Sequence, residues 1–356
     1  TGPKVSEFER RFAETIGVQH AVALNSCTAA LHVALDAVGV GPGDEVIIPT
    51  MTFATSAEVV LHLGARPVMV DCEPESLNLL VSAVEEAITD KTRAVMPVHY
   101  GGQSCDMDAL LEISGRYDIP IIDDAAHAFP AEYRGRPLGT IGTATAFSFY
   151  ATKTITTGEG GMLVTMDGDL AEKVRTLSLH GLSTDAWKRY SSGGSWDYSI
   201  VAPGYKYNLT DVAATLGLHQ LARAEEFWSA RSDIAKSYQQ AFAGIPEVRA
   251  LVEFDDRRHA WHLYVIRIST DSLTLDRNGV IKELGEKGIS TSVHYRPLHM
   301  HAFFRDEFGC EPSDFPNAAA AFEEIISLPI YSRMSQVDVD RVISGVSEVV
   351  SANRLG

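Results

Sequence analysis

Lys153 is the residue whose sequence surroundings most clearly indicate chemistry. It follows the strand-like run 146–150 and precedes the glycine-rich sequence 157–161, so a loop beside a tight turn would hold its amine. Another strand-like run ends in Asp123 and Asp124, which places carboxylates at the end of a neighbouring buried strand. A lysine can form a Schiff base, and a strand-end aspartate can pair with a pyridinium nitrogen. Together they indicate a pyridoxal-phosphate site.

The composition is that of a folded enzyme with a sizeable core. The chain has 356 residues, 45% of them hydrophobic, which is enough for one large and one smaller domain. No apolar run reaches the roughly 18 residues of a membrane span. A formal net charge of −17 disfavours nucleic acid, which requires clustered Lys and Arg. The four cysteines show no metal-ligand spacing. We therefore expect reduced thiols, no metal, and a cytoplasmic protein with neither a nucleic-acid nor a membrane partner.

Short β-branched runs alternate with longer amphipathic stretches, a pattern typical of an α/β fold with a mostly parallel sheet. The expected strands include residues 21–24, 45–48, 67–70, 94–98 and 119–122. Residues 209–244 lack strand-like runs and predict helices that lead out of this sheet. Strand-like runs at 261–268 and 289–295, around a helix, predict a second domain. We expect a large cofactor-binding domain at 1–239 and a small α+β domain at 240–356.

Seven motifs follow one another in an order that is informative as a set. They occupy residues 25–31, 41–49, 97–99, 123–127, 148 with 153, 204–211 and 293–295. In this order they resemble the DegT/DnrJ/EryC1/StrS family of sugar-nucleotide aminotransferases, over essentially the whole chain. The resemblance implies the aspartate-aminotransferase fold (fold type I), with pyridoxal 5′-phosphate as cofactor and pyridoxamine 5′-phosphate as its aminated form. The family usually has further residues before the segment that resembles Thr1, so we expect a missing amino-terminal piece.

The resemblance assigns roles to the residues around the cofactor ring. Lys153 would hold the cofactor as a Schiff base and move a proton between Cα and C4′, whereas a surface lysine is the alternative. Asp124 would form an ion pair with the pyridine nitrogen, and Asp123, the competing candidate, would be a helix cap or loop contact. His127 would lie near the phenolic oxygen, or be a packed residue. Phe53 would stack on the ring, with core packing as the alternative.

Phosphate binding is expected where Ser26, Cys27 and Thr28 lead into a predicted helix, because backbone amides at a helix start attract anions. A plain N-cap would also explain Ser26 or Thr28. The family usually has glycine in place of Cys27, which makes close backbone approach there less certain. Ser148 resembles the family's second phosphate hydroxyl. Asn208 resembles an asparagine donated by the neighbouring subunit, which implies a homodimer with shared active sites.

Five residues are candidates for contacting the substrate: Lys188, Arg189, His294, Tyr295 and Arg296. The first two belong to the irregular segment 183–204 and could bind a nucleotide diphosphate, with solvated surface charge as the alternative. The other three resemble the family's substrate-side motif and could contact the sugar or the carboxylate of the amino donor.

The predicted activity is a ping-pong amino transfer. L-glutamate would give its amino group to the cofactor and leave as 2-oxoglutarate, and the amine would pass to a keto group of a nucleotide-linked sugar. The motifs are most similar to the branch acting on 4-keto sugars, which includes the enzyme that makes UDP-4-amino-4-deoxy-L-arabinose, so a UDP-4-keto sugar is expected. The products of such enzymes enter lipopolysaccharide, capsule, other glycans or antibiotics. The alternatives are a 3-keto sugar aminotransferase, a cofactor-dependent dehydratase, whose branch has histidine in place of the lysine, and a non-catalytic cofactor-binding protein.

Overall fold

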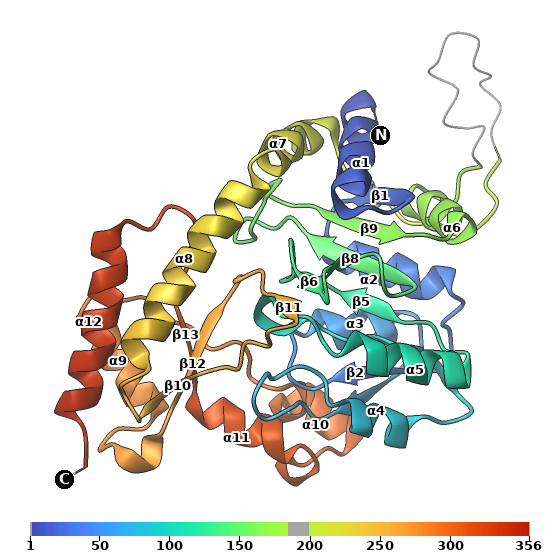
Figure 1. The fold of residues 1–356 in the computed structure, drawn as a ribbon. Helices are drawn as coiled ribbons and strands as arrows, with labels where there is room; N and C mark the ends of the chain where they lie inside the picture. The colour runs from blue at the N-terminus through green and yellow to red at the C-terminus, as the bar shows by residue number, and fades with distance from the viewer. Residues whose placement is uncertain (1, 184–198, 356) are drawn as a thin grey trace.

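The computed structural model describes residues 2–183 and 199–355. Figure 1 shows a large body of strands and helices and, at the C-terminal end, a smaller part flanked by α8, α9 and α12. The helices are α1 Pro3–Ile16, α2 Cys27–Ala37, α3 Thr55–His62, α4 Val81–Ala87, α5 Met107–Tyr117, α6 Gly168–Ser178, α7 Asp211–Leu221, α8 Ala224–Phe242, α9 Arg277–Glu286, α10 Ala302–Phe308, α11 Pro316–Glu324 and α12 Gln336–Ala352.

The strands of the large body are β1 His20–Leu24, β2 Glu45–Pro49, β3 Arg66–Val70, β4 Thr92–Val95, β5 Ile122–Asp124, β6 Glu132–Tyr133, β7 Arg136–Pro137, β8 Ala144–Ser148 and β9 Gly161–Thr165. The strands that follow are β10 Val248–Ala250, β11 Arg257–Arg258, β12 Tyr264–Ile268 and β13 Ile325–Leu328. None of the helices in the described ranges is long and apolar enough to cross a membrane.

The central sheet has two hydrogen-bonded sets of strands, β3-β2-β4 and β5-β8-β9-β1. Parallel bridges from Val95 to Ile121 and from Val98 to Asp124 connect the two sets. Within the sheet only β9 runs against its neighbours β8 and β1, whereas β5 pairs with β8, and β2 with β3 and β4, in parallel. The predicted mostly parallel α/β sheet is therefore confirmed.

Helices cover both faces of this sheet, which explains why its strands are apolar almost without alternation. In β9, Met162 and Val164 belong to one core, together with Phe8 and Phe12 of α1. Leu163, between them, belongs to the opposite core, which contains the buried face of α2. Successive side chains of a strand point to opposite faces, so both faces of β9 must be apolar.

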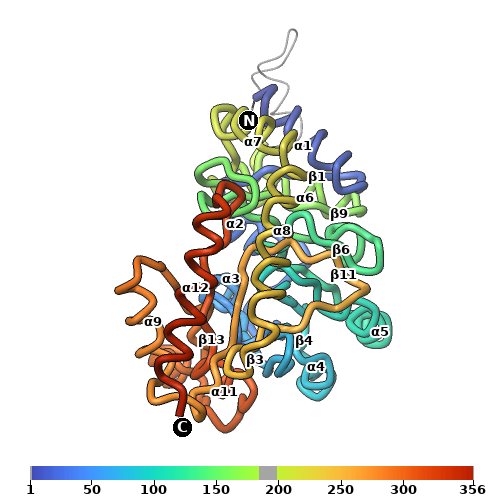
Figure 2. Tube along the Cα trace, turned by 60° about the vertical axis from the view of Figure 1, so that its left-hand side comes forward, coloured from blue at the N-terminus to red at the C-terminus, as the bar shows by residue number. Residues whose placement is uncertain are grey.

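The C-terminal part is built on the antiparallel sheet β10-β12-β13. Its core includes Tyr238 of α8, Ile266 of β12 and Val346 of α12, and Figure 2 shows α8 and α12 side by side. The strand predicted at 261–268 is present as β12, after which α9 follows as expected. The strand predicted at 289–295 is wrong, because only Ser292 forms a β-bridge there, to β13. The division of the chain at residue 240 stays a prediction, and α8 is continuous across that position.

Candidate active site

Lys153 and Asp124 line one cavity, with a volume of about 480 Å³. Its walls come from the start of α2, the end of β5, the segment after β8, and three residues of the C-terminal part: His262, His294 and Tyr295. The carboxyl ends of parallel strands meet at one edge of a sheet, where α/β proteins commonly bind ligands. Sequence reasoning placed the lysine and the carboxylate at this edge, and the structure brings them together.

The two aspartates that end β5 have opposite surroundings. Asp124 lines the cavity, where its carboxylate accepts hydrogen bonds from the Ala126 amide at 3.0 Å and the Ser56 hydroxyl at 3.4 Å. Asp123 is fully buried on the other face of the strand and accepts a hydrogen bond from the Thr145 hydroxyl at 2.9 Å. The expectation of a helix cap or loop contact for Asp123 is wrong. Of the two, only Asp124 can contact a ligand in the cavity.

Burial sets the charge balance around Lys153 and Asp124. It lowers the pKa of Lys153 from 10.5 to about 8, although Cys27 and Asp124 oppose this shift. Burial also raises the pKa of Asp124, partly offset by its hydrogen bond from Ala126 and by the charge of Lys153. A buried carboxylate is costly unless a cation faces it. The protonated ring nitrogen of pyridoxal phosphate would supply such a cation, so this residue set fits the cofactor.

The start of α2 forms the second half of the expected cofactor site. Ser26 is its N-cap, since the hydroxyl accepts a hydrogen bond from the Ala29 amide at 3.0 Å, as the simpler interpretation of this residue predicted. The amides of Cys27 and Thr28 belong to the first turn, where N–H groups have no partner within the helix. Ser26, Cys27 and Thr28 all line the cavity. The first turn of α2 can therefore receive a phosphate.

Gly161, at the start of β9, shows how tightly this turn is held. A Cβ atom on Gly161 would lie 2.4 Å from the Ser26 carbonyl oxygen and 2.6 Å from the Cys27 nitrogen. The strand backbone thus contacts the helix start directly, although Cys27 stands where the family usually has glycine. Cys27 is buried, and burial raises the pKa of its thiol well above the usual value. Ser148 also lines the cavity, and its hydroxyl accepts a hydrogen bond from the Tyr150 amide at 3.3 Å.

Aromatic and histidine side chains form the remaining wall. His127 Nε2 lies 2.9 Å from the Tyr295 hydroxyl, and the ring centroids of Tyr295 and Phe53 are 5.9 Å apart. Phe53 is 61% exposed and lines the cavity, so core packing, its alternative role, is wrong. His262 lies 3.4 Å from Lys153, measured from Nε2 to Nζ. Sequence reasoning missed His262 because it sits in an apolar run that predicted a strand; a histidine inside such a run was the available signal.

Of the predicted site residues that the structure describes, Arg296 and Asn208 do not line the cavity within this chain. Lys188 and Arg189 lie outside the described residues. Arg296 is exposed, and Asn208 donates a hydrogen bond to the Leu209 carbonyl at 3.2 Å. Their roles stay predictions, as do the individual roles of the cavity residues. Among the residues that the structure describes, no group of three or more His, Cys, Asp or Glu side chains could hold a metal ion.

Comparison with known proteins identifies the family. The model of the DegT/DnrJ/EryC1/StrS aminotransferase family matches residues 1–347. The chain belongs to this family. It is 50% identical, over 98% of its length and 90% of the relative's, to the spore coat polysaccharide biosynthesis protein SpsC of Bacillus subtilis.

Solved structures of this family show the same fold. A putative sugar aminotransferase of Streptococcus pneumoniae, Spr1654, in its PMP form, has a TM-score of 0.93 at 37% identity, covering 99% of this chain and 93% of that one. PseC of Helicobacter pylori, an aminotransferase involved in the biosynthesis of pseudoaminic acid, has a TM-score of 0.91 at 26% identity, with 99% and 92% covered. This DegT/DnrJ/EryC1/StrS chain is thus a sugar aminotransferase of fold type I that depends on pyridoxal phosphate, as the sequence predicted.

Proposed function

We propose that the protein transfers the amino group of L-glutamate to C4 of a UDP-linked keto sugar, acting in the cytoplasm as a homodimer. The amino sugar produced would enter a cell-envelope glycan or a natural product. The observation that carries the proposal is the meeting of Lys153, buried Asp124 and the first turn of α2 in one cavity. Relatives named for polysaccharide and pseudoaminic acid biosynthesis support a sugar as the acceptor.

Each of these groups has a separate task. Pyridoxal phosphate, when bound, supplies an aldehyde that receives the amino group and a ring that accepts electron density from the substrate carbon. Asp124 would keep a proton on the ring nitrogen, since its buried carboxylate favours a facing cation. The first-turn amides of α2 would hold the phosphate, with the Thr28 and Ser148 hydroxyls beside them.

Lys153 would hold the cofactor through Nζ and then move the proton. With a pKa of about 8 its amine can both accept and release a proton near neutral pH, which suits a residue that acts as base and acid in turn. His127 and Tyr295, joined by their hydrogen bond, lie on the same wall and would contact the ring oxygen and the substrate. Phe53 would stack on the ring.

The open side of the cavity supports a shared site in a homodimer. Thr28 and Phe53 line the cavity and are exposed in the single chain. Near Asn208, the exposed face of α7 carries Val212, which is 84% exposed, and Leu216. Exposed apolar side chains that cluster in this way are typical of interfaces. A second copy would cover this face and bring its own Asn208 to the cavity.

The first test is the visible absorption spectrum of the cofactor-loaded protein with L-glutamate as the only substrate. We expect the band of the lysine-bound cofactor to disappear as the amine form accumulates, and the Lys153→Ala variant to lack this response. A band that glutamate leaves unchanged would refute glutamate as the donor. UDP-linked 4-keto and 3-keto sugars are then supplied to the amine form, and NMR of the product identifies the aminated carbon. Nitrogen at C3 would contradict the C4 proposal.

The shared site is tested by mixing two inactive variants, Lys153→Ala and Asn208→Ala. In a mixed dimer with shared sites, both substitutions fall in one site and leave the other intact. Random mixing should then restore about a quarter of the wild-type activity, because half of the dimers are mixed and each has one intact site. No recovery after subunit exchange, confirmed by native mass spectrometry, would place Asn208 outside its partner's site.

A further inference from the structure

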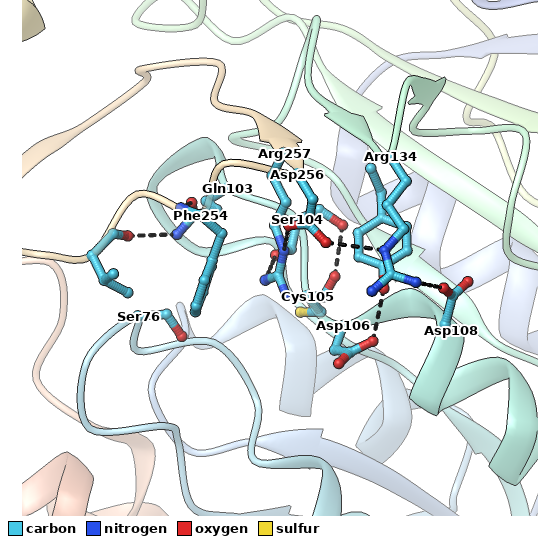
Figure 3. A network of polar contacts seen from close by, with 12 residues as sticks. Ser76, Gln103, Ser104, Cys105, Asp106, Asp108, Arg134, Phe254, Asp256 and Arg257 are labelled. Carbon is cyan, nitrogen blue, oxygen red and sulfur yellow. Dashed lines mark hydrogen bonds and ion pairs between the residues drawn. The ribbon is translucent and has the colours of Figure 1, made fainter.

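The chain crosses from the C-terminal part to the edge of the large body through residues 251–262, here termed the crossing segment. The Gln103 side chain anchors its beginning, donating to the Val252 carbonyl at 2.8 Å and accepting from the Phe254 amide at 2.9 Å. Further along, the Arg134 amide donates to the Asp256 carbonyl at 2.7 Å. Figure 3 shows the Gln103 anchor, the contact between the side chains of Arg134 and Asp256, and the contact of Arg257 with Ser104. The path of the segment is therefore held by polar contacts on the large body.

The crossing segment ends at His262, and the side chain of Arg231 holds the backbone there in place. Nη1 of Arg231, in α8, lies 3.1 Å from the Trp261 carbonyl, 3.3 Å from the His262 carbonyl and 3.0 Å from the Ile330 carbonyl. Arg231 is buried and has no carboxylate partner among the described residues. Nη1 therefore contacts the backbone carbonyls on both sides of the His262 Cα, which fixes the position from which the imidazole projects.

The imidazole of His262 is a neutral acceptor facing Lys153. Burial lowers the pKa of His262 well below its usual value, as do the charges of Lys153 and neighbouring groups. Its ring centroid lies 4.4 Å from that of His127, and Nδ1 is buried without a hydrogen-bond partner among the described residues. Nε2 lies 3.4 Å from Lys153 Nζ. A proton on Nδ1 leaves the lone pair of Nε2 for an N–H of Lys153.

Lys153 borders two cavities, so a free amine there has two directions to point. One is the active-site cavity, and the other, of about 560 Å³, is lined by Arg223, Arg231 and Arg333 among others. His262 lines the active-site cavity and not the second one. A hydrogen bond to His262 therefore keeps Nζ on the side where Asp124 lies.

We propose that His262 is a positioning residue, which accepts a hydrogen bond from Lys153 Nζ and keeps the free amine in the active-site cavity. The proposal rests on the proposed role of Lys153 as the lysine that holds the cofactor. His262 acts in the part of the cycle when the cofactor carries the amino group and Lys153 is free. The ionisable groups that influence or contact Lys153 are Cys27, Asp124, His127, Arg231, His262 and His294. The pKa shifts of the three histidines and of Cys27 favour their neutral forms, so His262 acts by hydrogen bonding.

The test measures the titration of Lys153 in protein loaded with pyridoxamine phosphate, where the amine is free. A small amine-reactive reagent labels it across a range of pH, and peptide mass spectrometry quantifies labelling at this lysine alone. His262→Leu fills the space but removes the acceptor, which disfavours the ammonium form. We expect the labelling midpoint to fall by about one pH unit, the tenfold change that one hydrogen bond to a charged group can supply. The glutamate half-reaction should slow by about tenfold in its maximal rate, with little change in KM.

Two further variants separate positioning from a structural effect. His262→Gln offers an amide oxygen at similar reach and should restore the midpoint. His259→Asn is the matched control, because His259 is a half-buried histidine of the same segment whose Nδ1 accepts from the Trp261 amide at 2.8 Å. It should leave the titration of Lys153 unchanged. A midpoint in His262→Leu equal to that of wild type, or higher, would overturn the inference, as would His262→Gln behaving like His262→Leu. If wild-type protein forms no lysine-bound cofactor band at all, the proposed function fails instead.

Discussion

Replacement of Gly161 by alanine should disturb the expected cofactor site through steric contacts with the start of α2. The added Cβ would lie 2.4 Å from the Ser26 carbonyl oxygen, whereas ordinary contacts begin at 3.4 Å. Relief of this contact requires β9 and the start of α2 to separate by about 1.0 Å, the difference between those two distances. Both contacts on this turn, to Ser26 and to Cys27, involve backbone atoms, which cannot rotate away as a side chain could. We therefore expect a loss of about 3 kcal/mol in the free energy of unfolding, near the upper end for overpacking.

The same displacement should weaken cofactor binding by about as much free energy as it takes from the stability of the fold. A shift of about 1 Å in a positioned group can cost roughly 100-fold, and the amides of Cys27 and Thr28 are the groups that would move. Titration of the cofactor-free protein with pyridoxal phosphate, followed by absorbance, measures the affinity, and urea unfolding measures the stability. Gly115→Ala is the matched control, since no heavy atom lies within 4 Å of its added Cβ in α5. That variant should be slightly more stable than wild type, by about 0.5–1 kcal/mol, and bind cofactor normally.

Two outcomes would refute the reasoning on Gly161, and they refute different parts of it. If Gly161→Ala is as stable as wild type, the contact between β9 and α2 is not as close as the structure shows. If the variant is destabilised but binds the cofactor with wild-type affinity, the first turn of α2 does not hold the phosphate.

Asp124→Asn should slow the glutamate half-reaction by about 10²–10³-fold, because a neutral amide does not hold a proton on the ring nitrogen; stopped-flow absorbance measures this rate. In the cofactor-free protein, Lys153→Met should raise the free energy of unfolding at pH 7, since the folded-state pKa of Lys153 is lowered from 10.5 to about 8. The cost of burying its charge is complete below pH 8 and disappears as the pH rises to 10.5, so wild type and variant should converge by then in urea unfolding. Arg231→Lys should lower the free energy of unfolding by about 2–3 kcal/mol, because the shorter lysine does not carry its ammonium to the place of Nη1, which contacts three backbone carbonyls. Thermal unfolding tests this, and equal stabilities would contradict it.

The strands of the central sheet and the place of Lys153 beside them were predictable because they depend on local sequence. A run of β-branched and apolar residues with a helix-like stretch on each side has few alternatives to a buried parallel strand. Lys153 and Asp124 follow such strands directly, so their place at the edge of the sheet follows from chain order. The strand predicted at 289–295 shows the limit of this reasoning. Its residues fit a strand, but the backbone groups of a strand must form hydrogen bonds with a neighbouring strand. Of the described residues in this run, only Ser292 forms a β-bridge.

What the sequence determined by itself was the fold class, the family, and the pairing of an amine with a carboxylate at one sheet edge. Tertiary structure decided which faces of the elements meet. Asp123 and Asp124 have the same side chain and adjacent positions, and only the packing of Asp123 against Thr145 leaves Asp124 to the cavity. His262 reaches Lys153 across 109 positions of sequence, through a segment anchored elsewhere on the large body. Such contacts depend on how distant segments pack, a property that no local pattern of residues encodes.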